Sequence, residues 1–287
     1  MKNIFVLGSL NTDLTINTKV FPKEGETVAG YGFKTAYGGK GLNQAIAAAK
    51  LGANVKFLGS VGNDDYGKKL VNLLKEWNID VTDIKISEVS SSGTAVIILN
   101  NSNNRIVLDL GANLEIKKDD INAFLKKANI GDIFVCQLEN NIDATEYALC
   151  AAKEKGLITV LNPAPANIEI AKSLKYVDYF VPNETEFNLL KDHLNIDTNL
   201  IITKGKDGYT FISKNTEFSS PAPKVKVVDT VGAGDTFVGA LAYILASEKP
   251  VNKENLDFVS KVASISTTKT GSSSSSPTLK EVLNYKW

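Results

Sequence analysis

Histidine, cysteine and arginine are scarce in this chain of 287 residues, and their scarcity excludes several kinds of site. His193 is the only histidine, so a zinc motif with paired histidines is excluded. Cys136 and Cys150 are the only cysteines, which excludes a thiolate zinc site and an iron–sulfur cluster. Both cysteines lie in apolar segments and are expected to be buried free thiols. A serine–histidine–acid triad is not expected, because no G-x-S-x-G motif is present.

An excess of charge is also absent, because Lys plus Arg and Asp plus Glu both number 32. Such a chain has no global attraction to DNA, RNA or anionic lipid, so no nucleic-acid or membrane partner is expected. No apolar run approaches the length of a membrane span. Residues 1–8 are too short in their apolar part for a signal peptide. We therefore expect a cytoplasmic protein, with a substantial core because 43% of its residues are hydrophobic.

Short apolar runs alternate with helical patterns over most of the sequence. This alternation is typical of βαβ units and predicts an α/β fold with a mostly parallel central sheet. The length allows one large domain or two ordinary ones. The expected strands are Ile4–Leu7, Val55–Val61, Ile133–Leu138, Ile158–Leu161, Tyr179–Val181 and Leu200–Thr203. The expected helices are Leu42–Leu51, Tyr66–Trp77, Asp119–Ala128, Ala144–Lys155, Thr236–Ala246, Lys253–Thr268 and Leu279–Tyr285.

Residues 14–36 and 93–110 depart from this rhythm, because apolar and polar residues alternate there with a period of two. Residues 100–104, Asn-Asn-Ser-Asn-Asn, favour a hairpin turn between the two strands of the second segment. We therefore predict that these segments form a small β-sheet lid, with an extension of the main sheet as the alternative. A lid would exclude water from a ligand crevice.

The segment DTVGAGDTF, Asp229–Phe237, leads directly into an apolar helical segment. Its small residues at 232–234 let the backbone approach a ligand closely. The first turn of the helix then offers unpaired N–H groups and the positive end of its dipole to an anion such as a phosphate. Asp235 lies at the mouth of this anion site, where its own charge is unfavourable. It is either a helix cap or a general base beside a transferring phosphoryl group, and the second interpretation explains the combination better.

Other nucleotide-binding signatures are missing. There is no G-x-x-x-x-G-K-[ST] motif, no G-x-G-x-x-G after the first strand, and no protein-kinase pattern. A second glycine cluster, GGKGLNQA at Gly38–Ala45, also opens a helix. Asn43 and Gln44 in this cluster carry donors and acceptors suited to sugar hydroxyls. A plain glycine-rich helix entry is the alternative.

Taken together, these motifs resemble those of the ribokinase-like carbohydrate kinases, the PfkB family. The resemblance covers nearly the whole chain, and DTVGAGDTF and GGKG-x-NQA in this order are its most specific parts. It implies one domain over residues 1–287, folded as a three-layer α/β/α sandwich with a lid. It also implies ATP-dependent phosphorylation of D-ribose at O5. The other matching segments are Val6–Asp13, Phe21–Val28, Gly59–Gly67, Gln137–Glu139, Leu161–Ala166, Pro182–Glu186, Ile202–Gly208 and Gly271–Pro277.

The resemblance implies that Asp235 is the base that accepts the proton of the sugar hydroxyl. The backbone N–H groups of Gly232, Ala233 and Gly234 would stabilise the transferring phosphoryl group. Without the family pattern, an acid at a sugar-binding position would be interpreted as a surface or capping residue. The residues implied in sugar binding are Asn11, Asp13, Gly39, Lys40, Gly41, Asn43, Glu139 and Asp235.

Asn183 and Glu186 match the family's N-x-x-E element, which organises Mg²⁺ and the phosphates of ATP, and they are equally compatible with an ordinary helix cap. Ser260 stands where some relatives carry histidine or asparagine near the adenine, so the contacts with the base differ there. The residues implied in ATP binding are Asn183, Glu186, Thr203, Gly205, Lys206, Gly208, Gly234 and Ser260.

The resemblance also implies a monovalent cation, usually potassium, beside the anion site. The serine run at 272–276 has the composition of a linker. The resemblance instead implies that this run is part of the cation site. Hard cations prefer oxygen ligands. The implied ligands are the Asp229 carboxylate, the Ser275 hydroxyl and the backbone carbonyls of Val231, Ser266, Lys269 and Gly271. Members with this type of lid pair as homodimers through it, and the same is expected here.

Two alternatives stay open at this point. Within the class, the phosphate acceptor is deoxyribose, another pentose, a hexose or a nucleoside. Outside the class, the chain is a catalytically silent sugar-binding regulator. The intact Asp235, glycine segment and N-x-x-E element argue against the second alternative.

Overall fold

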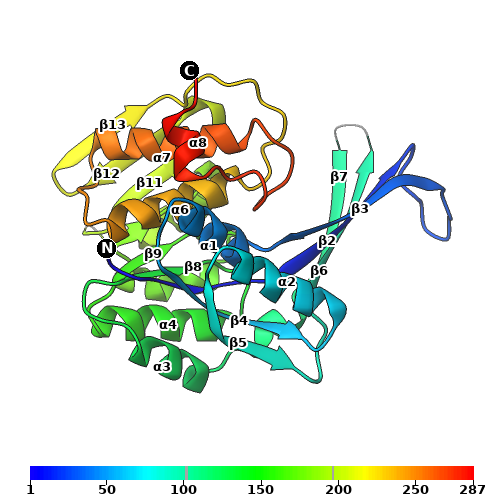
Figure 1. Cartoon of the computed structure of the whole chain (residues 1–287), viewed down its shortest axis with the longest axis horizontal. Coiled ribbons are helices and arrows are strands. Elements are labelled where there is room, and N and C mark those ends of the chain that lie inside the picture. The colour runs from blue at the N-terminus through cyan, green and yellow to red at the C-terminus, as the bar shows by residue number, and fades with distance from the viewer. Residues whose placement is uncertain (101–102, 196) are drawn as a thin grey trace.

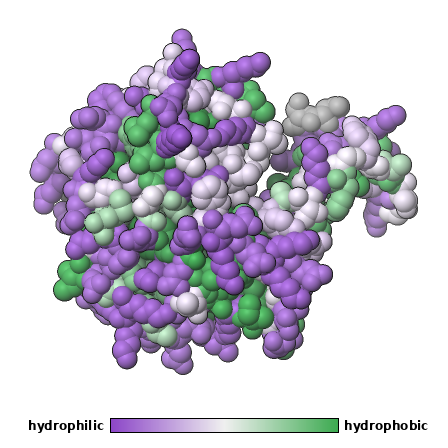
Figure 2. Space-filling model, in the orientation of Figure 1, coloured by the Kyte–Doolittle hydropathy of each residue, from purple (hydrophilic) through white to green (hydrophobic). Residues whose placement is uncertain are grey.

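The computed structural model describes residues 1–100, 103–195 and 197–287 and contains one large and one small β-sheet (Figure 1). The two sheets differ in how they are covered. Helices lie on both sides of the large sheet, whereas the small sheet projects from the body of the molecule (Figures 1 and 2). The large sheet therefore carries the core, and the small one is exposed.

Within the described residues the large sheet has nine strands, and its pairs are parallel from β11 to β5. β12 and β13 extend one edge in antiparallel orientation. The predicted α/β fold with a mostly parallel sheet is confirmed. In sheet order the strands are β13 (Thr216–Ser220), β12 (Tyr209–Ser213), β11 (Asn199–Thr203), β10 (Tyr179–Phe180), β9 (Ile158–Leu161), β8 (Ile133–Cys136), β1 (Ile4–Leu7), β4 (Val55–Gly62) and β5 (Asp80–Ser87).

Side chains of successive strand residues point to opposite faces of the large sheet, which creates two cores. In β1, Ile4 and Val6 pack under one helical layer, and Phe5 and Leu7 pack under the other. Burial on both faces explains why these strands read as continuous apolar runs. The first layer contains α1 (Lys40–Lys50), α2 (Asp65–Glu76), α6 (Ala233–Ala246), α7 (Lys253–Ser266) and α8 (Leu279–Leu283). The second contains α3 (Lys118–Lys126), α4 (Ile142–Glu154) and α5 (Glu184–Leu190).

Helices α1 and α6 approach each other closely at Gly239. A Cβ atom at this position would lie 2.5 Å from the Gln44 carbonyl oxygen and 2.6 Å from the Ala47 Cβ. The glycine therefore has a packing role although it lies inside a helix, where glycine lowers stability. The contact fixes the distance between the two helices that begin at the glycine-rich segments.

The small sheet has the order β3-β2-β6-β7, with β2 and β6 parallel and the other pairs antiparallel. The predicted hairpin is confirmed by the pairing of β6 with β7, whereas its turn residues Asn101 and Ser102 lie outside the described residues. β2 begins at Asn11, before the expected boundary at 14, and thus includes Asp13. The strands are β3 (Gly30–Gly38), β2 (Asn11–Thr18), β6 (Gly93–Asn100) and β7 (Asn103–Asp109). Its role as a lid stays a prediction.

The predicted elements are found in the structure, and their ends differ by a few residues. Helix α1 begins at Lys40 and α6 at Ala233, so both start earlier than the apolar pattern indicates. The elements β5, β12, β13 and α5 were not predicted. Cys136 is buried as expected, whereas Cys150 is only partly buried, so that expectation was wrong. Among the described residues, no helix combines the length and apolarity that a membrane span needs.

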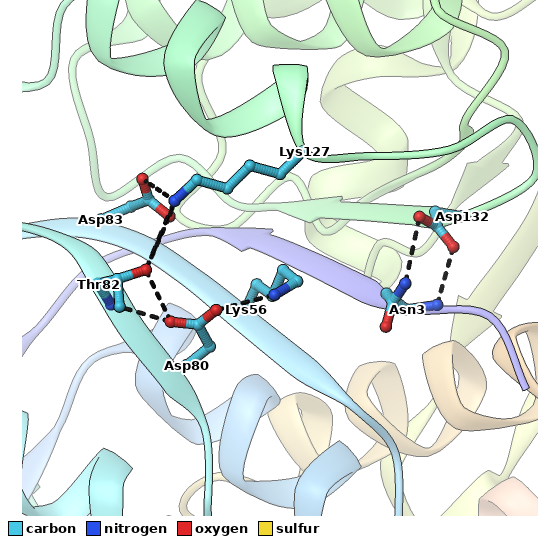
Figure 3. A network of polar contacts seen from close by, with 7 residues as sticks. All are labelled: Asn3, Lys56, Asp80, Thr82, Asp83, Lys127 and Asp132. Atoms are coloured by element: carbon cyan, nitrogen blue, oxygen red, sulfur yellow. Dashed lines mark hydrogen bonds and ion pairs between the residues drawn. The ribbon is translucent and has the colours of Figure 1, made fainter.

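A polar network ties β5 and the loop after α3 to the rest of the scaffold (Figure 3). Lys56 pairs with Asp80 at 2.8 Å, and Lys127 pairs with Asp83 at 2.6 Å. Partly exposed pairs of this kind contribute about 1 kcal/mol or less each. Lys56 and Asp80 lie at the amino ends of β4 and β5, so this network stabilises the edge of the sheet formed by the amino ends of the strands. Ligands of such folds bind at the other edge, where the carboxyl ends of the strands meet.

Candidate active site

The carboxyl ends of the parallel strands meet at one edge of the large sheet, and the candidate site lies there. Ser9 follows β1, Glu139 follows β8, Asn162 follows β9, and Thr203 ends β11. Open parallel sheets bind their ligands at this edge. A cavity of about 160 Å³ lies beside the start of α6. It is lined by Lys40, Asn162, Ala164, Val181, Asn183, Glu186, Thr203, Gly232, Gly234, Asp235 and Val238.

Asp235 lies in the first turn of α6, and both of its carboxylate oxygens accept hydrogen bonds from side chains of α1. Asn43 Nδ2 donates to Oδ2 at 2.9 Å, and Gln44 Nε2 donates to Oδ1 at 3.0 Å. The N-cap residue of α6 is Gly232, and the carboxylate is not turned back toward it. The interpretation of Asp235 as a helix cap is therefore wrong.

Burial is the largest influence on Asp235 and raises the pKa of its carboxyl group above the ordinary value. The Lys40 ammonium and the amides of Asn43 and Gln44 oppose this effect and favour the carboxylate. A carboxylate with a raised pKa is a better proton acceptor than an exposed one. The residue thus has the electrostatic setting of a base that is held in place before a substrate arrives.

Gln44 is held by other amides and is not free to bind a sugar. Its Nε2 also donates to Asn162 Oδ1 at 3.1 Å, and its Oε1 accepts from Gln137 Nε2 at 2.6 Å. The expectation that Gln44 serves sugar hydroxyls was therefore wrong. Asn43 differs, because its buried Oδ1 accepts no hydrogen bond from the described residues. Buried acceptors of this kind usually have a partner, and a ligand hydroxyl would supply one.

The first turn of α6 presents backbone N–H groups to the cavity. Gly232 has φ = 76°, in the left-handed region, and a Cβ there would lie 2.8 Å from Ser272 Cα. Both observations require glycine. The Ala233 N–H lies 3.3 Å from the Thr230 carbonyl oxygen and is partly engaged. In the part of the chain that the structure describes, the Gly232 and Gly234 amides donate to no protein acceptor.

Glu139 collects donors from three segments at the sugar side of the site. Its Oε2 accepts from Ser9 Oγ at 2.6 Å, from the Lys40 N–H at 3.0 Å and from Asn11 Nδ2 at 3.4 Å. Asn113, which the sequence did not single out, donates to Asn11 Oδ1 at 2.9 Å and orients that amide. The structure therefore brings together the predicted residues Asn11, Lys40 and Glu139.

Asp13 and Asn43 meet at Gly38. The point where a Cβ of Gly38 would stand lies 3.1 Å from Asp13 Oδ2 and 3.8 Å from Asn43 Oδ1. Burial, together with the nearby Glu139 carboxylate, raises the pKa of Asp13 to about 6. Asp13 and Asn43 thus present oxygens to one small region, in which the charge of a neighbouring carboxylate opposes the ionisation of Asp13.

The two other glycines of this cluster have packing roles. Gly39 has φ = 94°, and its Cβ would lie 2.7 Å from the Ser9 carbonyl oxygen. A Cβ on Gly41 would lie 2.4 Å from Gly8 Cα. These contacts dock the start of α1 on the end of β1. They account for both glycines without a ligand, so sugar contact at Gly39 and Gly41 stays a prediction.

Lys40 places a positive charge among three acids. Burial lowers its pKa, but the combined charges of Asp235, Glu139 and Glu186 outweigh burial and raise the pKa above the ordinary value. The side chain lines the same cavity as Gly232 and Gly234. The lysine therefore lies on the anion side of the site as well as close to Glu139.

Asn183 and Glu186 form a reciprocal cap at the start of α5. Asn183 Oδ1 accepts from the Glu186 N–H at 2.9 Å, and Glu186 Oε2 accepts from the Asn183 N–H at 2.8 Å. Both residues also line the cavity. Burial raises the pKa of Glu186 despite this hydrogen bond. The capping interpretation is confirmed, and it leaves the two residues facing the site.

Asp229 joins two of the loops expected to hold a monovalent cation. Its Oδ1 accepts from the Val231 N–H at 3.0 Å, and its Oδ2 accepts from the Gly271 N–H at 3.0 Å. The Ser266 carbonyl already accepts from the Lys269 N–H at 3.2 Å, and the Ser275 hydroxyl donates to the Ser272 carbonyl. The residues 271–277, here called the serine loop, are not a linker, because Ser272, Ser273, Ser275 and Ser276 are buried.

The residues expected to hold ATP lie partly in the cavity lining and partly outside it. Thr203 lines the cavity, and Gly205, Lys206 and Gly208 form the turn between β11 and β12. Lys206 is exposed, and Gly208 has φ = 86°. Ser260 is buried on α7 and is not part of the cavity lining. Asn162, Ala164, Val181 and Val238 line the cavity although the sequence did not single them out. Asn162 and Ala164 belong to Leu161–Ala166, a segment named only for its family resemblance.

Comparison with known proteins adds to this geometry. The model of the pfkB family carbohydrate kinases matches residues 1–279. Ribokinase of Schizosaccharomyces pombe is 38% identical over 98% of this chain and 97% of its own length. Deoxyribokinase of Salmonella typhimurium is 36% identical over 99% and 98%. The structure of Arabidopsis thaliana ribokinase complexed with ribose and ATP matches with a TM-score of 0.88 and 26% identity, over 99% of both chains.

Proposed function

The chain belongs to the pfkB family of carbohydrate kinases, and from this premise we propose that it transfers the γ-phosphoryl group of ATP to O5 of D-ribose. It is an ATP-dependent sugar kinase with a ribokinase-like fold. One observation carries the assignment of roles. The Asp235 carboxylate, fixed by two amides, and the amides of Gly232 and Gly234 converge on one cavity.

Asp235 acts as the proton acceptor in this proposal. Asn43 and Gln44 each occupy one of its carboxylate oxygens, which leaves further lone pairs for the hydroxyl of the sugar. An aspartate does not deprotonate an alcohol in advance. In a loose phosphoryl-transfer transition state the proton leaves late, so the fixed position of the carboxylate contributes most.

The start of α6 stabilises the charge of the transferring group. The amides of Gly232 and Gly234 donate to no acceptor within the described part of the chain, and the positive end of the helix dipole adds to them. Ala233 contributes less than the sequence indicated, because its N–H is partly engaged by Thr230. Lys40 supplies a full positive charge beside these amides.

The acidic side of the cavity fits Mg²⁺. Glu186 and Asp235 are both buried, and their raised pKa values indicate that a nearby cation would stabilise their charges. Mg²⁺ keeps several waters and needs few protein ligands. Glu186 and Asn183 would hold it through water, and it would neutralise the phosphate oxygens of ATP.

The loop around Asp229 fits a monovalent cation. Oxygen atoms of Asp229, Val231, Ser266, Lys269, Gly271 and Ser275 belong to segments that the Asp229 hydrogen bonds hold together. The Ser275 hydroxyl donates its hydrogen to Ser272 and keeps its lone pairs. Such a cation would add positive charge beside the start of α6. The expected potassium dependence rests on this donor set.

The nucleotide side of the site is formed, in this proposal, by Thr203, Gly205, Lys206, Gly208 and Ser260. Asn11, Asp13, Asn43 and Glu139 form the sugar side, because their oxygens and amides lie close together at the base of the small sheet. The small sheet then serves as the lid. Its strand β2 carries Asn11 and Asp13 and so connects lid and sugar.

The sugar affinity is expected to depend on the ionisation of Asp13. Its pKa of about 6 means that its charge is lost as the pH falls below that value. A charged hydrogen bond contributes about 1.5–3 kcal/mol, so Asp13→Asn should weaken sugar binding by roughly tenfold or more at pH 7. Calorimetry from pH 5 to pH 8 should show wild-type affinity falling below pH 6 and a flat profile for the variant. A flat wild-type profile would contradict the role.

The stability of the unliganded protein should fall as the pH rises, whereas its affinity for the sugar should increase. Because the folded pKa of Asp13 is raised, the stability linked to this group is complete below about pH 4 and is lost as the pH rises through 6. At pH 7, Asp13→Asn should therefore be more stable than wild type, by about 1–2 kcal/mol after allowance for partial exposure. Denaturant unfolding at pH 4 and pH 7 tests the sign.

Deoxyribose is the second candidate acceptor, because the Salmonella deoxyribokinase is nearly as similar to this chain as the ribokinase of S. pombe. The deciding experiment measures kcat/KM for ribose, 2-deoxyribose, other pentoses, hexoses and nucleosides with ATP and Mg²⁺. Ribose should give the highest value. Sugar binding without turnover for every acceptor would favour the sugar-binding regulator instead.

The exposed small sheet supports a homodimer. It carries large apolar side chains, with Tyr31 60% and Phe33 62% exposed on β3, and Val107 71% exposed on β7. Exposed apolar surface of this kind marks a contact site, and a second copy of this chain is the proposed partner. Light scattering that gives the monomer mass of 31.0 kDa at micromolar concentration would refute it. The cytoplasmic location stays a prediction.

A further inference from the structure

The ammonium group of Lys50 lies among backbone carbonyls of the serine loop. Its Nζ donates to the carbonyl oxygens of Ser276 at 2.8 Å, Ser273 at 3.0 Å and Ser274 at 3.1 Å. Three acceptors match the three hydrogens of an ammonium group. Lys50 is the last residue of α1, the helix whose first turns hold Asp235. One helix therefore contacts both the proposed base and the serine loop.

The surroundings of Lys50 do not favour a positive charge. The side chain is partly buried and packs on the Trp77 ring, with 4.8 Å from Nζ to the ring centroid. Burial, followed by the nearby Lys269 ammonium, lowers the pKa of Lys50 to about 8, although the Glu281 carboxylate opposes them. At neutral pH the lysine still carries its charge. A cation kept in this setting is held by specific acceptors, which are the loop carbonyls.

Polar contacts, and not an apolar core, fix the shape of the serine loop. A run of five serines offers no apolar side chain to a core, yet four of them are buried. Buried carbonyl groups need donors. Lys50 satisfies three carbonyls at once from outside the loop, so it acts as a cross-link between α1 and the segment that connects α7 to α8.

The loop in turn contacts the anion side of the site. Ser272 Cα lies where it leaves no room for a Cβ on Gly232. The Ser276 hydroxyl is 2.7 Å from the hydroxyl of Thr236, the residue after Asp235, and both side chains are buried. Ser273 Oγ also donates to the Tyr37 carbonyl at 3.3 Å, at the base of the small sheet. A shift of the loop would therefore reach the first turn of α6.

We propose that Lys50 is a positioning residue for phosphoryl transfer, because its ammonium fixes the serine loop and the loop fixes the first turn of α6. The proposal rests on the kinase function proposed above. Lys50 touches neither sugar nor nucleotide in this scheme and acts only through Gly232 and Thr236. Its bonds go to the carbonyls of residues 273, 274 and 276, so they leave the expected cation ligands Gly271 and Ser275 free.

The test compares Lys50→Met, Lys50→Arg and the control Lys75→Met. Lys75 is the matching basic residue in the last turn of α2 and is exposed. Displacement of a catalytic group by a fraction of an ångström to 1 Å costs up to about 100-fold, so Lys50→Met should lower kcat roughly 10- to 100-fold. Sugar affinity without nucleotide should fall much less than kcat, because Asn11 and Glu139 make their hydrogen bonds outside the serine loop, with each other and with Ser9 and the Lys40 N–H. Lys50→Arg should recover most of kcat, and Lys75→Met should behave as wild type.

Hydrogen exchange supplies a second readout that does not depend on turnover. Exchange in Lys50→Met should accelerate in residues 271–277 and 232–236 and stay unchanged in the strands of the large sheet. Wild-type kcat together with wild-type exchange would overturn the proposal. Uniformly faster exchange over the whole chain would also overturn it, since that result indicates a role in global stability alone. If the wild-type protein phosphorylates no sugar, the proposed function fails, and the exchange pattern still decides whether Lys50 fixes the first turn of α6.

Discussion

Asp235→Asn is expected to fold, to bind both substrates and to turn over about a thousandfold more slowly than wild type, or worse. General-base catalysis contributes about 10²- to 10⁴-fold, and asparagine keeps the shape of the side chain but cannot accept the proton. The variant should fold because the amides around it can adapt. Gln44 keeps its place through Gln137 and Asn162, while the Asn43 amide can rotate and accept from the new NH₂ group with its unpartnered Oδ1.

Stability should separate this result from misfolding. Removal of a buried carboxylate with a raised pKa relieves desolvation, so the melting temperature of Asp235→Asn should equal or exceed that of wild type. Asp143→Asn is the matched control, because Asp143 is an exposed acid in the first turn of α4. Loss of such a charge costs about 0.3–1 kcal/mol of helix stabilisation and should not affect kcat. If Asp235→Asn keeps an ordinary kcat, the proposed mechanism is wrong.

Gly232→Ala should show the second large effect, with kcat lower by roughly 100-fold or more. A side chain forces this residue away from φ = 76° and pushes against Ser272 Cα, which lies 2.8 Å from the Cβ position. The free amide of Gly232 then moves relative to the phosphoryl group. Loss of one preorganised donor costs about 3 kcal/mol in comparable sites. Steady-state kinetics and denaturant unfolding measure the two consequences.

Two other glycines separate the contributions. Gly52 has φ = 98°, and among the described residues only its chain neighbours come within 4 Å of its Cβ position, so Gly52→Ala should show only the cost of a left-handed backbone, about 1–2 kcal/mol, with normal turnover. Gly234 also has open space around it and lies in the helix, so Gly234→Ala should not lower stability. Gly232→Ala should be less stable than Gly52→Ala. Equal stability and unchanged kcat would show that the contact with Ser272 has no role.

The parallel sheet and the position of Asp235 were accessible from the sequence because they depend on local patterns. Apolar runs of four to eight residues with helices between them leave few arrangements, and β1, β4, β8, β9, β10 and β11 follow them. Two glycine-rich helix starts in one such sheet are expected near its carboxyl edge. The family resemblance then implied that Asp235 and the GGKG segment serve one sugar site, which no local pattern contains.

Contacts between segments that are distant in the sequence could not be predicted from local patterns. Gln44 looked like a ligand residue because its amide suits a sugar, but its partners Gln137, Asn162 and Asp235 come from three other parts of the chain. Asn113 carries no local signal for its role beside Asn11. The serine loop has the composition of a linker, and its burial depends on contacts with Lys50, Tyr37 and Thr236, which come from distant parts of the chain.

Because of the tight contact at Gly239, the position of the proposed base relative to α1 depends on a residue without any functional group. Position 239 is one helical turn beyond Asp235 and presses against the backbone of Gln44. A methyl group there would push α1 away from α6 and lengthen the hydrogen bonds from the amides of Asn43 and Gln44 to the Asp235 carboxylate. A change in kcat would then arise from a substitution that touches neither substrate nor base, at a place where a search for reactive side chains finds nothing.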